Sequence, residues 1–154
     1  MPGVSVFMRA VMASWPDPPF SELVAFVAGR EGGFTVVPIN GRDWSEFEIN
    51  DKHGQAVLAA DITVGDEARE ELAELAEELE DLDGSPAAQA TVQSMLETAS
   101  TVVGLQILMS RYDESVAAAN LVIAFLERWP GVLTQVDSVG WYDGDRLILT
   151  EADK

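Results

Sequence analysis

The fold of this chain is decided by a helix-to-strand passage that reads Val122-Ile-Ala-Phe-Leu-Glu-Arg-Trp-Pro-Gly-Val-Leu-Thr-Gln-Val136. Its first residues are apolar and fit a helix, Pro130-Gly131 ends that helix, and the residues that follow fit a strand. An earlier stretch, residues 23–37, has the same order of apolar helix, glycine-rich stop and strand. The match indicates that one structural unit occurs twice.

Each passage is preceded by an apolar strand and followed by further strands with turn residues between them. Asn40-Gly41 and Asp143-Gly144 are turn signals of this kind. The predicted strands are residues 4–12, 34–39, 45–50, 56–62, 102–109, 132–136, 139–142 and 146–150. The predicted helices are residues 18–28, 66–82, 86–99 and 113–129, with Asp17, a Thr63–Asp66 capping box, Ser85 and Asp113 at their starts.

These elements predict a single α+β domain over residues 1–154. Two strand–helix–strand–strand–strand repeats, residues 4–62 and 101–150, form a mostly antiparallel sheet with helices on one side. Residues 63–100 join the repeats as an acidic helical hairpin, which we expect beside the other helices. The chain is long enough to bury a core without disulfides or metals.

Charge and composition exclude several classes of function. Nine Lys and Arg residues against 27 Asp and Glu residues leave a formal charge of −18, which disfavours binding to nucleic acids and anionic lipids. The absence of cysteine and the single histidine, His53, exclude thiolate catalysis and cysteine or multi-histidine metal sites. We therefore expect no metal and no cofactor. Because no signal peptide and no membrane-spanning stretch is visible, we expect a cytoplasmic protein without a membrane partner.

Residues 66–83 hold ten acidic residues and one cation, Arg69. A surface of this kind attracts basic proteins, so we expect a basic protein partner. The alternative is a purely structural role, in which the acidic face is solvated and the leucines of the helix pack on the core of the same domain. The candidate partner-binding residues are Glu70, Glu71, Glu74, Glu77 and Glu78.

A second candidate site is a small-molecule pocket between the two repeats. Tryptophans at the ends of elements can line a groove, and an inward-pointing arginine needs an anionic partner. The candidate pocket residues are Arg9, Met12, Trp15, Trp44 and Trp141, and ordinary core packing is the alternative. Residues 116–129 are apolar nearly all round, which predicts a homodimer if nothing else covers this helix.

Three classes of function remain after these exclusions. The first is a non-enzymatic interaction or regulatory protein that docks a basic partner on its acidic helix. The second is a ligand-binding module with a pocket between the repeats. The third is an enzyme that uses only Asp and Glu, which we place last because no nucleophile–base pair, metal cluster or phosphate loop is visible.

Overall fold

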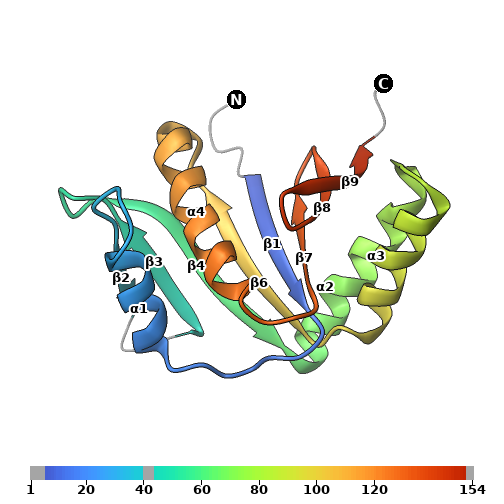
Figure 1. Ribbon diagram of the computed structural model, residues 1–154, viewed down its shortest axis with the longest axis horizontal. Coiled ribbons are helices and arrows are strands. Elements are labelled where there is room, and N and C mark those ends of the chain that lie inside the picture. The colour runs from blue at the N-terminus through green and yellow to red at the C-terminus, as the bar shows by residue number, and fades with distance from the viewer. Residues whose placement is uncertain (1–5, 40–43, 152–154) are drawn as a thin grey trace.

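The computed structural model describes residues 6–39 and 44–151, so residues 4 and 5 and the predicted Asn40-Gly41 turn lie outside the described residues. Within these ranges, nine strands form one antiparallel sheet with the order β2-β3-β4-β6-β1-β7-β8-β9-β5 (Figure 1). The strands are β1 (Val6–Met12), β2 (Thr35–Pro38), β3 (Glu46–Asn50), β4 (Ala56–Val64), β5 (Leu82–Asp83), β6 (Thr101–Ile107), β7 (Val132–Val136), β8 (Gly140–Asp143) and β9 (Arg146–Glu151). The helices are α1 (Phe20–Ala28), α2 (Gly65–Glu78), α3 (Pro86–Thr98) and α4 (Tyr112–Leu126). The α+β class and the antiparallel sheet are confirmed.

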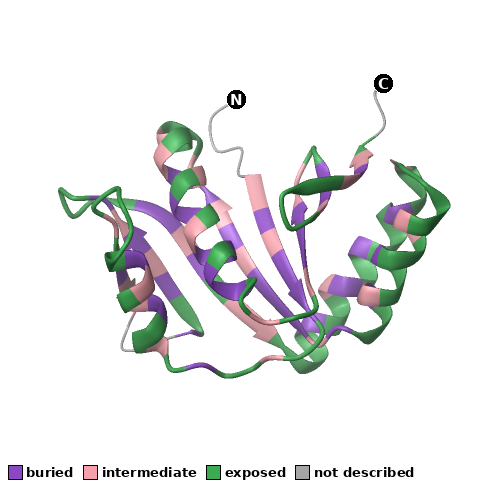
Figure 2. Ribbon diagram, viewed as in Figure 1, coloured by how far each residue is buried: buried purple, intermediate pink, exposed green. Residues whose placement is uncertain are grey.

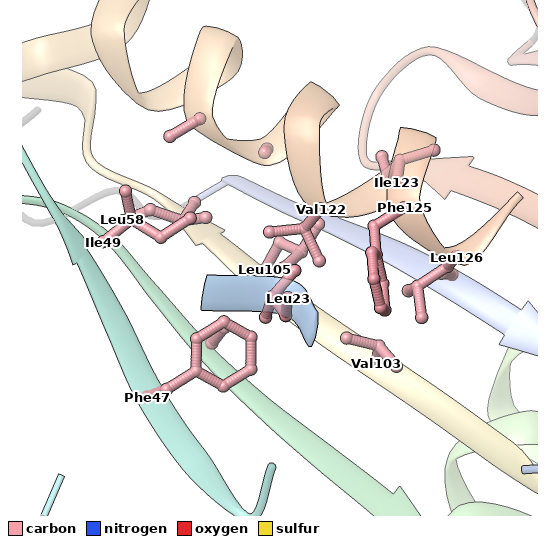
Figure 3. Packing of buried hydrophobic residues seen from close by; sticks show 14 of the residues in the cluster. Leu23, Phe47, Ile49, Leu58, Val103, Leu105, Val122, Ile123, Phe125 and Leu126 are labelled. Carbon is pink, nitrogen blue, oxygen red and sulfur yellow. The ribbon is translucent and has the colours of Figure 1, made fainter. Parts of the chain in front are cut away.

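The helices cover both faces of the sheet, which corrects the prediction of helices on one side. Met8, Ala10 and Met12 of β1 belong to the core cluster that contains α1 and α4. Val11, which points to the opposite face, belongs to a second cluster with the leucines of α2 and the apolar residues of α3. Figure 2 shows the buried residues along the central strands, and Figure 3 shows the packing of α4 on the first face.

The physical reason for two covered faces is visible in β6. Val102 and Val103 are consecutive residues of this strand and are both fully buried, although adjacent residues of a strand point to opposite faces. A strand that is apolar on both faces needs a layer on each of them. The helices α2 and α3, which form the predicted acidic hairpin, therefore pack on the face of the sheet opposite α1 and α4.

Both halves contain the predicted element order of one strand, one helix and three strands. The equivalent first strands, β6 and β1, lie side by side in the middle of the sheet, but the strands that flank this pair are not equivalent. The first half contributes its last strand, β4, next to β6, whereas the second contributes β7, the strand that follows its helix directly, next to β1. The short link after α4 fixes this placement, because Ala13 N–H donates to Gly131 O at 3.1 Å and holds the link beside the end of β1.

The helix starts were predicted less well than the strands. Asp17 has a φ of 52° and caps nothing, since α1 begins after Pro19. The Thr63–Asp66 capping box is also absent, because the N-cap of α2 is Val64 and no side chain caps it. At α3 the prediction is correct: Ser85 accepts a hydrogen bond from the N–H of Ala88 at 3.1 Å.

The acidic segment is shorter as a helix than predicted. α2 ends at Glu78, a 3-10 turn follows at Leu79–Asp81, and Leu82 begins the short strand β5, which pairs with β9. β5 was not predicted. Among the described residues, no helix is long and apolar enough to cross a membrane.

Candidate functional site

The face of the sheet behind α1 and α4 is only partly covered by α2 and α3. Two adjoining hollows remain there, one of about 270 Å³ over β3, β4 and β6 and one of about 350 Å³ between α2 and β1. We call these two hollows together the acidic basin. Its charged residues are Arg9, Glu46, Glu48, Asp61, Glu67, Glu70, Glu71, Glu74, Glu78 and Asp137.

Strand pairing brings the floor of the acidic basin together. Glu46 pairs with Asp61, Asp61 with Gly104, and Gly104 with Arg9, so these residues form one row across four strands. Side chains in such a row point to the same face of a sheet. The row therefore places acids from β3 and β4 on the same surface as a cation from β1.

The wall of the acidic basin is one side of α2. Its glutamates at 67, 70, 71, 74 and 78 recur at helical spacing and lie on one face. Leu72 and Leu75 lie on another face of the same helix and are buried in the core. Burial of these leucines fixes the rotation of the helix, so its glutamates face the open sheet.

Arg9 lies at the centre of the acidic basin and is held by three partners. Its Nε donates to Glu71 at 2.7 Å, and its Nη1 donates to Asp137 at 2.7 Å and to Gln135 at 2.6 Å. Partial burial works against the charged guanidinium, but the hydrogen bonds and charges of Asp137 and Glu71 outweigh it and raise the pKa of Arg9. The basin therefore already holds one guanidinium, bound by two carboxylates and an amide.

Asp61 is the floor carboxylate with the most perturbed surroundings. Partial desolvation raises its pKa, and repulsion from Glu71 and Glu46 raises it further. Gly104 leaves room for this carboxylate, because a Cβ at that position would lie 2.9 Å from Asp61 Oδ1. Carboxylates from β3, β4 and α2 therefore repel one another across this hollow. Binding of a cation there would relieve that repulsion.

Four of the five predicted partner-binding glutamates line the acidic basin. Glu70, Glu71, Glu74 and Glu78 lie along it, whereas Glu77 is exposed on another side of α2. Glu71 is already engaged by Arg9. The helix thus presents the predicted acids, but its leucines pack within this domain.

The five predicted pocket residues do not line one cavity. Trp15 and Trp44 pack edge to face with ring centroids 4.9 Å apart, and Met12 is buried in the same cluster. Trp141 belongs to the cluster on the opposite face, and Arg9 lies in the acidic basin. The sheet separates these side chains: Met12, Trp15, Trp44 and Trp141 pack in the two core clusters, and Arg9 is engaged in the acidic basin.

The apolar helix predicted to need a partner is covered largely from within. The sheet lies under α4, and α1 lies beside it, with the rings of Phe26 and Phe125 5.4 Å apart. The helix of residues 86–98 lies on the other face. The homodimer remains a prediction.

Five acids of the basin were not among the predicted partner-binding residues, namely Glu67, which lies in the predicted acidic segment, and Glu46, Glu48, Asp61 and Asp137, which lie outside it. The alternation of residues 45–50 already indicates that Glu46 and Glu48 point away from the core. Their proximity to α2 depends on the pairing of β3 with β4, the strand that leads directly into α2, and the alternation alone does not reveal that pairing.

Within the described residues, no group of three or more histidine, aspartate or glutamate side chains is arranged to hold a metal ion. No protein-family model, no curated protein and no solved structure matches this chain. The acidic basin must therefore be interpreted from its own chemistry.

Proposed function

We propose that this protein is a non-enzymatic interaction protein that binds a lysine- and arginine-rich segment of a partner protein in the acidic basin. The observation that carries the proposal is the concave arrangement of nine carboxylates around one guanidinium, contributed by α2 and the open sheet face. Such a surface attracts a basic segment over long range and orients it on arrival.

The manner in which Arg9 is bound supports this proposal. Two carboxylates and an amide hold its guanidinium, which is the geometry that a partner's arginine requires. Glu67, Glu70, Glu74 and Glu78 form no salt bridge with any described residue. These four side chains are the ones we assign to the basic partner.

An enzymatic function on the same surface is less well supported. Asp61 has the raised pKa that a carboxylate general acid requires. Glu46 lies next to Asp61 in the same row and supplies a second carboxylate, but the hollow around the pair is open. An open site does not exclude water from a reaction, so binding is the better supported function.

The test measures binding of a labelled oligoarginine peptide by fluorescence anisotropy at low and high salt. The basin variant is E67Q/E70Q/E74Q/E78Q, and the control variant E31Q/E77Q/E80Q/E97Q changes the net charge equally at exposed acids outside the basin. We expect the basin variant to weaken binding about tenfold or more at low salt, because the ion pairs between these four glutamates and the peptide are lost. The control should weaken it by less than about threefold, since only the long-range field changes.

Equal losses in the two variants would show that the peptide responds to net charge alone, and the proposal would then be wrong. A basin variant that binds as tightly as the wild type would also overturn it. Circular dichroism of all three proteins checks that the fold is retained.

A further inference from the structure

A groove on the opposite face of the sheet is not used by the proposed function. It has a volume of about 490 Å³ and lies between α4 and the strands β7 and β8. In Figure 1 α4 lies on one side of β1 and the strands β7 and β8 lie on the other, with α1 beyond α4. We call this hollow the α4–β8 groove.

One end of the α4–β8 groove is apolar. Val116 of α4 faces this end, and Met8, Val136 and Val139 line it from the sheet side. Met8 pairs with Val136, and Val136 pairs with Gly140, so this end lies at the start of β1. Tyr112 and Val139 at this end are unusually exposed for large side chains, at 50% and 37%. An apolar ligand gains free energy by covering them.

The other end of the groove is acidic. It is lined by Glu127, which follows α4, and by Asp145 in the β8–β9 turn. Partial burial raises the pKa of Glu127, and the charges of Asp145 and Asp143 raise it further. The neighbouring Arg128 does not relieve this repulsion, because its guanidinium lies over the ring of Phe125, 4.9 Å from the centroid. The Nη2 atom of Arg146 lies 3.8 Å from Oδ2 of Asp143, and both side chains are exposed to solvent.

A buried hydroxyl without a partner lies in the wall of the groove. Thr134 is only 4% exposed, and its Oγ1 makes no hydrogen bond to any described residue. It pairs with Tyr142, the last residue but one of β8, so it lies between the apolar end at Val136 and the acidic β8–β9 turn. A buried hydroxyl of this kind is costly unless a ligand or water satisfies it.

We propose that the α4–β8 groove binds an amphipathic organic ammonium ion. The charged end lies between Glu127 and Asp145 and donates a hydrogen bond to Thr134 Oγ1, while the alkyl or aryl body covers Val116, Val136 and Val139. The ammonium relieves the repulsion among the carboxylates, and the body removes the exposed apolar side chains from water. An alcohol or a carboxylate of the same shape satisfies only part of the groove.

Calorimetric titration with 3-phenylpropylammonium, 3-phenylpropanol and 3-phenylpropanoate tests this proposal. We expect the ammonium ion to bind at least about tenfold more tightly than the alcohol, and the carboxylate to show no binding. The variant E127Q/D145N should lose about tenfold in affinity for the ammonium ion. The control E31Q/E97Q, with the same charge change at exposed acids outside the groove, should lose less than about twofold.

Thr134→Val separates a ligand contact from a structural role. Removing an unsatisfied buried hydroxyl should leave the melting temperature unchanged or raise it, while the affinity for the ammonium ion falls about threefold to tenfold. Equal binding of the ammonium ion and the alcohol, equal losses in both charge variants, or unaltered affinity in Thr134→Val would overturn the proposal. If the ammonium ion does not bind while the oligoarginine peptide still does, the groove proposal is wrong and the proposed function of the acidic basin stands.

Discussion

At the scale of single residues, Arg111 and Asp51 join the two halves of the sequence. Arg111 precedes α4 and donates from Nη2 to Asp51 Oδ2 at 2.6 Å, while its Nη1 donates to Gln55 Oε1 at 3.1 Å. Asp51 Oδ1 also accepts the backbone N–H groups of His53 and Gln55. The bond from Arg111, followed by the backbone bond from Gln55, lowers the pKa of Asp51 to about 2. The β3–β4 turn is thereby held against the start of α4.

We expect Asp51→Asn to make the protein less stable near neutral pH and to remove part of its acid sensitivity. The lowered pKa means that Asp51 stabilises the fold fully above about pH 4, and that this contribution is lost as the pH falls from about 4 to 2. Urea unfolding at a series of pH values measures the difference between wild type and variant. That difference should shrink towards pH 2, and a difference independent of pH would contradict the assignment.

At the scale of elements, the β8–β9 hairpin depends on Gly140. This residue has a φ of 142°, and a Cβ there would lie 1.9 Å from the carbonyl oxygen of Leu149. We expect Gly140→Ala to destabilise the protein by more than about 2 kcal/mol, because the clash is with backbone of the paired strand. Gly144 is the matched control, since its φ is 65° and no atom lies within 4 Å of its Cβ position.

Gly144→Ala should cost only about 1–2 kcal/mol, the price of the left-handed conformation alone. Chemical denaturation of both variants measures the two losses. A loss in Gly140→Ala no larger than that in Gly144→Ala would show that the hairpin shifts to accommodate the methyl group.

Strands were predicted more reliably than helix starts because their signal is local. Alternation in residues 45–50 and the Asp143-Gly144 turn are enough to define β3 and the last hairpin. The start of α1 depends on a distant contact instead, since the Trp44 indole N–H donates to the carbonyl oxygen of Pro18 at 2.8 Å. No pattern near Asp17 shows that bond, so the predicted cap was wrong.

At the scale of the whole molecule, the fold class followed from element order, whereas the arrangement of the sheet did not. The pairing of β1 with both β6 and β7 joins residues at least 89 positions apart, since the shortest separation is that of Met12 and Thr101. The same long-range pairing brings Asp137 to Arg9, whereas Asp61 lies near the glutamates of α2 because β4 leads directly into that helix. Neither position was predicted, so only the helical part of the acidic basin was recognised from the sequence. The adjacent buried pair Val102 and Val103 carried the missing signal for two helical layers.

The surplus of negative charge should lower the stability of the protein in dilute salt. Glu78 is the last residue of α2 and lies near the negative end of the helix dipole, and no basic residue in the last turn offsets its charge. We expect Glu78→Gln to raise stability by about 0.3–1 kcal/mol at low ionic strength. Thermal unfolding at about 10 mM and 0.5 M NaCl should show this gain shrinking as salt screens the charges. A gain that is the same in both salts would point to a cause other than charge.

The central position of β1 also governs how the chain is folded while it is being made. Both neighbours of this strand, β6 and β7, are encoded far downstream, and the second ends at Val136. A ribosome that adds about 5–20 residues per second needs roughly 6–25 s to pass from the end of β1 to the end of β7. Until β6 has been made this apolar strand has two unpaired edges, and one edge stays unpaired until β7 follows. We therefore expect chaperone binding and aggregation of the nascent protein to involve its first strand.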